Sequence, residues 1–172
     1  MKFLATIGNG ITKANTFIAR VVSYLIYPII FVIVIEVFFR YILKAPTPYT
    51  YDLSWMMYGT MIFLGGAYAL ADNVHVKADI IYNSLKRKAK LVIDVLCYPA
   101  FFFTTVAALI YSTYILMANA WAFNEISRMT SWGPPTGPVR TILFISFVIL
   151  GLQGIVKFGE LIRDAVKGGD DT

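Results

Sequence analysis

The sequence predicts an all-α integral membrane protein with four transmembrane helices and a short interfacial segment between the first two. The chain of 172 residues is 58% apolar and only 15% charged, whereas soluble domains are about 45–50% apolar and about 25% charged. Four long stretches carry no charged residue, at 21–35, 53–71, 95–124 and 141–156. None of them shows the alternation of a transmembrane β-strand, so helices are expected.

With their apolar flanks, these stretches predict a single membrane domain. Its helices are expected at about 17–43, 53–72, 90–124 and 138–163, with the interfacial segment at about 46–53 and a tail at 164–172. Each helix reaches the roughly 17–25 residues that a membrane crossing needs. Pro28 and Pro99 lie inside the first and third helices, and we expect both prolines to kink them.

The distribution of basic residues predicts the orientation. Most lysines and arginines fall near the two termini and between the second and third helices, which places these segments in the cytoplasm. Trp55, Trp121 and Trp132 then share the opposite side, where they suit an aromatic belt. The basic run at 86–90 fits anionic membrane lipids better than nucleic acid.

Few residues are suited to cofactor chemistry. Cys97 and His75 are the only cysteine and histidine in the chain, which leaves no intrachain disulfide, no bis-histidine haem and no cysteine set for an iron–sulfur cluster. The sequence also lacks a paired-carboxylate site within the membrane and a defensible Ser/His/Asp arrangement. We therefore expect no enzyme activity and no bound cofactor, although structural lipids would suit the surface.

Three acidic residues near the helix ends are expected to form local ion pairs. Glu36 and Arg40 stand at i and i+4, so they share one helical face. Glu125 and Arg128, at i and i+3, suggest a second pair. Asp94 lies four residues after a lysine near the start of the third helix, which favours a third salt bridge.

An alternative role for Glu36 is proton coupling in a self-sufficient small transporter. An ionisable residue in a membrane helix is a functional candidate by default. However, the neighbouring Arg40 favours the ionised carboxylate, whereas a proton carrier must gain and lose its proton. A structural ion pair is therefore the preferred interpretation.

Two further patterns concern the second helix and the segment after it. Small residues stand four positions apart at Gly65/Ala69 and at Ala67/Ala71, with Gly66 between the two pairs, and this spacing allows close contact with another helix of the chain or of a partner. His75 and Asp79 stand at i and i+4, where they suit a hydrogen-bonded clasp or, because histidine titrates near neutrality, a pH sensor.

Taken in order, these motifs resemble the small membrane subunit, or DctQ type, of tripartite ATP-independent periplasmic (TRAP) transporters. The resemblance covers roughly residues 17–163 and depends on the order and spacing of several short motifs. They are RY at 40–41, the aromatic–acidic stretch at 49–52, FLGGA at 63–67, HVKAD at 75–79, SWGPP at 131–135 and LQG at 152–154. The chain departs from the family where Tyr49 replaces a common tryptophan and where Asp52 supplies one acid instead of two.

The resemblance implies a non-catalytic scaffold subunit in a bacterial inner membrane. Such a subunit packs beside a large polytopic membrane subunit, which uses a sodium gradient and binds the sodium itself. A periplasmic solute-binding protein delivers an organic acid or a related solute. Arg128 and the loop around Trp132 are candidates for contact with that binding protein.

Overall fold

The computed structural model describes residues 2–72, 95–96 and 98–167, which form helices joined by loops. Within this part of the chain, four segments are long and apolar enough to cross a membrane: Gly8–Tyr41, Thr50–Ala71, Tyr98–Ala122 and Gly137–Arg163. The described residues form no strand, apart from an isolated bridge between Ile126 and Pro135. The predicted all-α membrane fold is therefore confirmed.

The first span consists of two helices, α1 (Lys2–Ser23) and α2 (Ile26–Tyr41). At the junction, Tyr24 and Leu25 donate their backbone N–H groups to carbonyls three residues back, which interrupts the regular ladder. Pro28 lies in the first turn of α2, where a missing N–H leaves no bond unmade. The break expected from this proline is present.

The first helix begins well before the predicted start at about 17, since α1 already includes Lys2. Several of the residues before position 17 are polar. One of them, Asn15, is only 3% exposed because its side chain bonds to Gln153 of another helix. A polar residue is thus accommodated inside the helix packing rather than at the end of the span.

The second helix, α3 (Thr50–Ala71), follows a loop at 42–49. The structure differs here from the expected separate interfacial element at 46–53, because residues 50–53 are the first turn of α3 itself. The third span begins with a π-helix, η1 (Tyr98–Phe103), which contains Pro99 and continues as α6 (Thr104–Ala122). A π-bulge is a common cause of helix distortion, and it accounts for the irregularity expected at Pro99.

The fourth helix, α7 (Gly137–Lys167), is the longest. A loop at 123–136 joins it to α6. Asn124, which ends α6, has a left-handed backbone with φ of 47°, and the following Glu125 N–H bonds back to Ala120 O at 2.9 Å. Asparagine tolerates this conformation better than most residues, so it is a suitable helix terminator.

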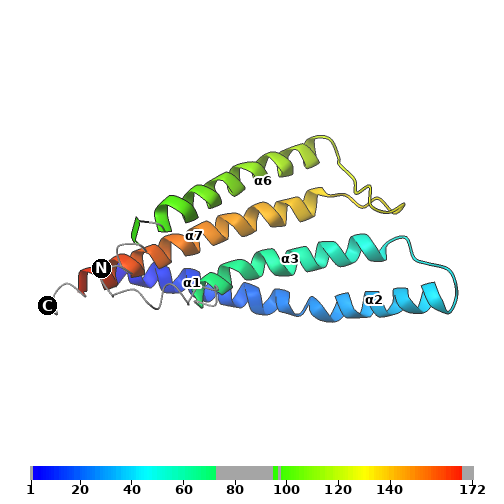
Figure 1. Ribbon diagram of the computed structural model, residues 1–172, viewed down its shortest axis with the longest axis horizontal. Helices are drawn as coiled ribbons and strands as arrows, with labels where there is room; N and C mark the ends of the chain where they lie inside the picture. The colour runs from blue at the N-terminus through cyan, green and yellow to red at the C-terminus, as the bar shows by residue number, and fades with distance from the viewer. Residues whose placement is uncertain (1, 73–94, 97, 168–172) are drawn as a thin grey trace.

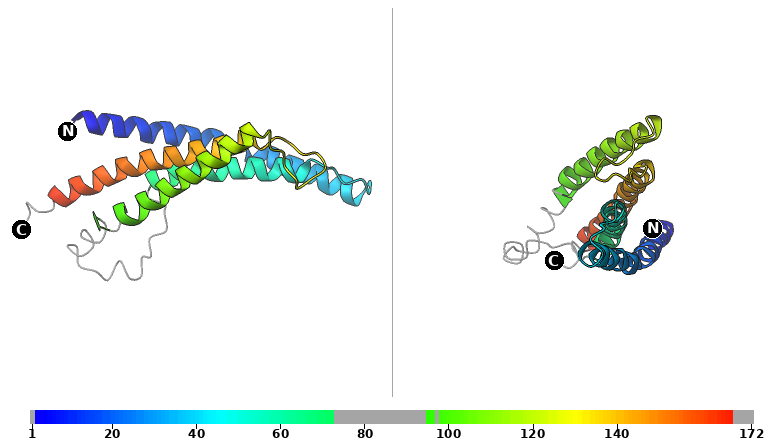
Figure 2. Two further views of the ribbon diagram at one scale, coloured as in Figure 1. Left: turned by 90° about the horizontal axis from the view of Figure 1, so that it is seen from above. Right: turned by 90° about the vertical axis from the view of Figure 1, so that its right-hand side faces the viewer.

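The helices are arranged in a row rather than around one closed core (Figure 1 and Figure 2). α3 packs against α1, α2 and α7, while α6 lies at one edge and packs on α7. The beginning of α1 and the end of α7 lie at one end of the molecule, and the loops at 42–49 and 123–136 lie at the other, which we call the loop end.

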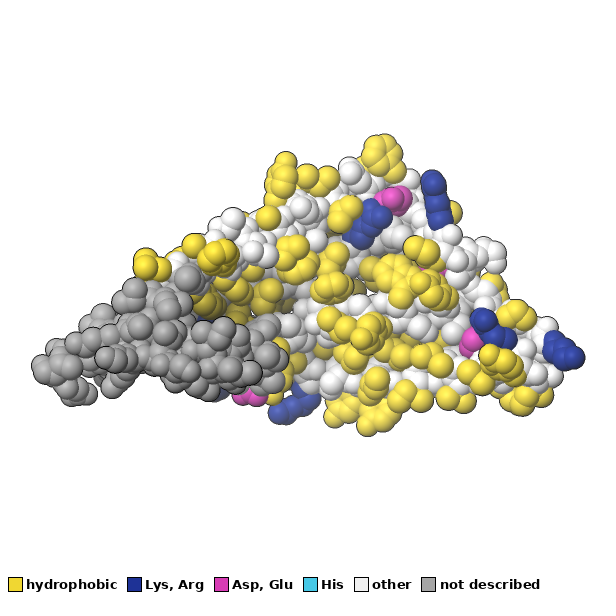
Figure 3. Space-filling view, in the orientation of Figure 1, with side chains coloured by type: hydrophobic (Ala, Val, Ile, Leu, Met, Phe, Trp, Pro, Cys, Tyr) yellow, Lys and Arg dark blue, Asp and Glu magenta, His cyan; other side chains and the backbone are white. Residues whose placement is uncertain are grey.

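The interior of this row is more polar than apolar. In the described residues, the buried aliphatic side chains are Ile29, Ala67, Val106 and Ala120, and buried polar side chains outnumber them. Large apolar side chains instead cover the outside of the helices, and the few charged side chains visible in Figure 3 are scattered among them. This inverted distribution suits an environment of lipid and partner helices rather than water.

Candidate functional site at the loop end

Glu36 joins the end of α2 to the beginning of α3. Its side chain is only 9% exposed, and its Oε1 accepts bonds from Arg40 Nε at 2.9 Å and Nη2 at 2.6 Å. Its Oε2 accepts from the backbone N–H of Thr47 at 3.0 Å, from the Thr47 hydroxyl and from the Thr50 hydroxyl at 3.2 Å. The ion pair predicted from the i, i+4 spacing is therefore present, and two threonines extend it.

Asp52 joins the first turn of α3 to the loop at 123–136. The residue is completely buried. Its Oδ1 accepts bonds from Trp55 Nε1 at 3.0 Å and Ser127 Oγ at 2.5 Å, and its Oδ2 accepts one from the Thr130 hydroxyl. A buried carboxylate is tolerated when hydrogen bonds replace its lost hydration, as they do here.

The loop at 123–136 is folded back on itself. Ser127 N–H bonds to Pro134 O at 2.8 Å, and Thr136 N–H bonds to Glu125 O at 2.9 Å. Trp132, near its tip, lies edge-on to Tyr49 of the other loop, with ring centroids 6.5 Å apart. The two loops are thus connected by both an aromatic contact and the Asp52 hydrogen bonds.

The predicted pairing of Glu125 with Arg128 is wrong. The Glu125 carboxylate instead forms an ion pair with Arg140 in α7. The i, i+3 argument requires a helix, and α6 has already ended at Ala122 before Glu125 is reached. Arg128 is exposed and makes no ion pair within the described residues.

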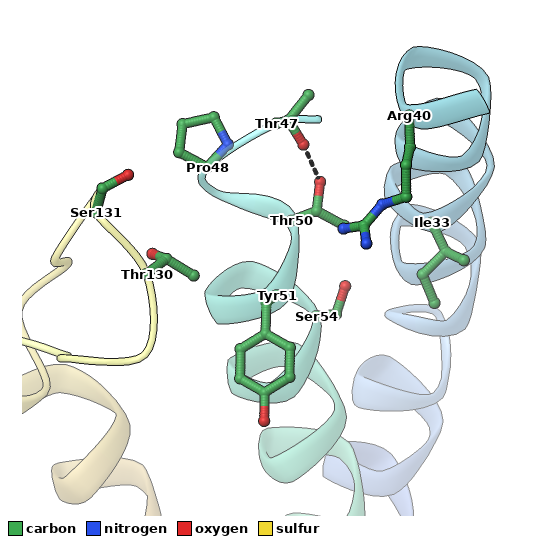
Figure 4. Close-up of a pocket in the computed structure, with 9 residues that line it drawn as sticks. All are labelled: Ile33, Arg40, Thr47, Pro48, Thr50, Tyr51, Ser54, Thr130 and Ser131. Carbon is green, nitrogen blue, oxygen red and sulfur yellow. Dashed lines mark hydrogen bonds between the residues drawn. The ribbon is translucent and has the colours of Figure 1, made fainter. Parts of the chain in front are cut away.

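A pocket of about 390 Å³ lies between these two clusters (Figure 4). Arg40 enters it from α2, and Ser54 lies below the guanidinium on α3. The Ser54 hydroxyl is buried and has no hydrogen-bond partner in the described structure. The remaining lining residues come from α2, α3 and the two loops: Ile33, Thr47, Pro48, Thr50, Tyr51, Thr130 and Ser131.

The other predicted residues fall outside this site. Gly65 and Gly66 lie in α3, and a Cβ atom added to either would meet open space. His75, Asp79 and Asp94 lie outside the described residues, as does the basic run at 86–90. The clasp, pH-sensor and third salt-bridge hypotheses therefore remain predictions.

A second polar contact, missed in the sequence analysis, joins α1 to α7 nearer the termini. Asn15 Nδ2 donates to Gln153 Oε1 at 2.7 Å, and Gln153 Nε2 donates to Thr12 Oγ1 at 3.2 Å. Gln153 is fully buried. A signal was available, because Gln153 is the one amide side chain in the apolar stretch at 141–156.

None of these clusters is arranged to hold a metal. Within the described residues, no group of three or more histidine, cysteine, aspartate or glutamate side chains converges on one point. The clusters connect α2 with α3, α3 with the second loop, and α1 with α7. Their geometry is that of structural links between helices.

The family comparison agrees with this description. The model of the DctQ component of tripartite ATP-independent periplasmic transporters matches residues 29–164, which include three of the four apolar spans and the last part of the first. The chain belongs to the DctQ family. In the comparison with curated proteins, no sequence matches it.

As a DctQ protein, the chain is the small permease component of a TRAP transporter. The DctQ family consists of transporter components and is not a family of enzymes. The match covers Glu36, Arg40, Asp52 and both loops, so the whole loop-end site lies inside the family region. The matched region begins after α1, so Asn15, which bonds to Gln153, lies outside it.

Proposed function

We propose that this DctQ subunit is a stationary scaffold in a sodium-driven TRAP transporter. It packs in the inner membrane against the large membrane subunit, which binds sodium and moves the solute. The solute is an organic acid or a related compound that a periplasmic binding protein delivers. The termini face the cytoplasm and the loop end faces the periplasm, where Arg128 and Trp132 are accessible to the binding protein.

The outer face of α6 is the observation that carries this proposal. α6 packs on one side against α7, through Val106, Thr113 and Ala120. On its exposed side, Thr105, Ser112 and Asn119 recur every seven residues. Their side chains have no hydrogen-bond partner in the described part of the chain.

Such a face suits a protein helix better than lipid. Hydrocarbon offers no hydrogen-bond partner to a hydroxyl or an amide, whereas serine, threonine and asparagine side chains bond across helix pairs in membranes. Ala108 and Ala122 share the exposed side and allow close approach of backbones. The seven-residue spacing matches the slight tilt of left-handed helix packing. A helix of the large subunit would therefore continue the row beyond α6.

The test is co-purification of the large subunit with a tagged form of this chain. We expect the wild-type chain to recover it. The double variant Ser112→Leu/Asn119→Leu keeps the span apolar but removes both polar groups and adds bulk, so recovery should fall about tenfold, which corresponds to about 1.4 kcal/mol. The matched control, Phe31→Leu/Val34→Leu, changes two exposed residues of α2 and should retain full recovery.

Two outcomes would contradict the proposal. If the wild-type protein purifies without any large membrane protein, the proposed scaffold function is wrong. If the α6 variant and the α2 control recover equal amounts of the large subunit, the scaffold function stands but α6 is not the contact face.

The alternative, proton coupling through Glu36, has no structural support. Both carboxylate oxygens already accept hydrogen bonds from donors that favour the ionised form. Glu36→Gln in an assembled transporter should therefore leave proton dependence of uptake unchanged. Loss of proton dependence, with assembly intact, would restore the alternative.

A further inference from the structure

The pocket at the loop end has hydrogen-bond donors for which the surrounding described residues provide no acceptor. An arginine side chain has five N–H donors, and the contacts of Arg40 with Glu36 use Nε and Nη2 on the same carboxylate oxygen. The Nη1 group is uncommitted, and the Arg40 side chain is 57% exposed. Ser54 adds a buried hydroxyl with no partner.

The neighbouring threonine hydroxyls already donate their hydrogens to carboxylates. The hydroxyls of Thr47 and Thr50 are directed to Glu36, and the Thr130 hydroxyl is directed to Asp52. These bonds also stabilise the two carboxylate charges, and neither carboxylate is part of the pocket lining. A ligand that satisfies the pocket must therefore bring acceptors to Arg40 and Ser54, as a phosphate oxyanion does.

The position of the pocket favours a phosphate that belongs to a lipid. Arg40 is the penultimate residue of the span Gly8–Tyr41, which is the depth of the phospholipid headgroups. Ile33 lies seven residues earlier on α2, about 10 Å deeper along the helix at 1.5 Å per residue. The lining therefore combines the Arg40 guanidinium and several hydroxyl groups with the aliphatic side chain of Ile33 on α2 (Figure 4).

We propose that this pocket binds the phosphodiester group of a phospholipid from the leaflet at the loop end. The Arg40 guanidinium and the Ser54 hydroxyl donate to phosphate oxygens, and an acyl chain extends along Ile33. The bound lipid fills the space between α2 and the tip of the second loop. The site lies within this one chain and does not depend on the proposed contact with the large subunit.

The experiment is native mass spectrometry of the purified, delipidated full chain. It is titrated in separate samples with phosphatidylglycerol, with diacylglycerol of the same acyl chains and with inorganic phosphate. We expect a stoichiometric adduct with phosphatidylglycerol and none with diacylglycerol. Equal binding of the two lipids would show that the phosphate is not recognised, and it would overturn the proposal. Displacement of the lipid by millimolar inorganic phosphate would assign the site to a soluble oxyanion instead.

Variants identify the two donors. Ser54→Val removes the unpartnered hydroxyl without touching either carboxylate cluster, and it should weaken phosphatidylglycerol binding about tenfold. Arg40→Gln should weaken it at least as much, and Arg40→Lys should recover part of the binding because it restores the charge. Thr60→Val is the matched control, since it removes from the same helix a hydroxyl that bonds only to Met56 O. Unchanged binding in Ser54→Val and Arg40→Gln, with elution volumes like the wild type, would contradict the assignment.

Discussion

At the scale of single residues, the two buried carboxylates determine how the loop end is held together. Glu36 and Asp52 are both close to the ends of spans, yet neither faces solvent freely. Each is stabilised by donors from more than one segment, because burying a charge without such bonds is strongly unfavourable. Glu36 receives its bonds from sequence neighbours, whereas Asp52 receives two of its three from the distant loop.

Asp52 should therefore contribute more to stability than an exposed acid of the same helix. Asp52→Ala removes the acceptor for Trp55, Ser127 and Thr130, and a hydrogen bond to a charged group is worth about 1.5–3 kcal/mol. We expect a clear fall in the midpoint of thermal unfolding in detergent. Asp52→Asn, which keeps one carbonyl oxygen, should give a smaller fall.

The control for this prediction is Asp72→Ala at the other end of α3. Asp72 is exposed and accepts one side-chain bond, from Tyr68 at 3.2 Å. Its removal should leave the midpoint nearly unchanged, since exposed polar contacts contribute little. Similar midpoints for Asp52→Ala and Asp72→Ala would mean that the Asp52 cluster does not hold the second loop.

Residue pairing was predictable only where the backbone was already known to be helical. The Glu36–Arg40 pair follows from helical spacing, and it is present. The same reasoning failed for Glu125, because Asn124 ends the helix in a left-handed conformation just before it. The contacts of Asp52 with Ser127 and Thr130 depend on how two loops fold together, and hydropathy carries no information about that.

At the scale of helices, close packing depends on glycines of α7 rather than those of α3. A Cβ atom at Gly154 would lie 2.8 Å from Phe102 Cζ and even closer to Cε1. The Phe102 ring cannot easily move away, because it stacks on Tyr98 with centroids 4.8 Å apart and meets Phe103 edge-on. This aromatic group therefore fixes the distance between η1 and α7.

Gly154→Ala should disturb that contact, and overpacking of this kind costs about 1–3 kcal/mol. We expect a lower unfolding midpoint and easier proteolysis of the purified protein. Gly159→Ala, one and a half turns further along α7, places its methyl group in open space and serves as the control. A Gly154→Ala protein as stable as Gly159→Ala would show that the aromatic cluster can be rearranged at little cost.

The sequence predicted the helices better than their contacts. Hydropathy identified all four spans, and the two prolines marked both irregular places, since each effect is local to its own helix. The small residues of the second helix suggested close packing at Gly65 and Gly66, but the space beside both is open within the described chain. Which glycine touches a neighbour depends on helix rotation, and a nearly uniform apolar surface does not specify that rotation.

At the scale of the whole molecule, the arrangement is a row whose two ends differ in chemistry. The loop end holds both carboxylate clusters, the pocket and the Trp132–Tyr49 contact. The opposite end holds the beginning of α1 and the end of α7 and lies nearer the Asn15–Gln153 contact. Under the proposed scaffold function, these chemically different ends would hold the subunit at one depth in the membrane.

The distribution of basic residues predicts which end faces which compartment. In a Cys97→Ser background, a cysteine introduced as Arg128→Cys marks the loop end, where Arg128 is exposed. A cysteine introduced as Thr172→Cys marks the C-terminal tail. A membrane-impermeant maleimide should label the first in intact cells and the second only after the inner membrane is permeabilised. The reverse labelling pattern would show that the orientation is opposite to the predicted one. The loop at 123–136 would then face away from any periplasmic binding protein.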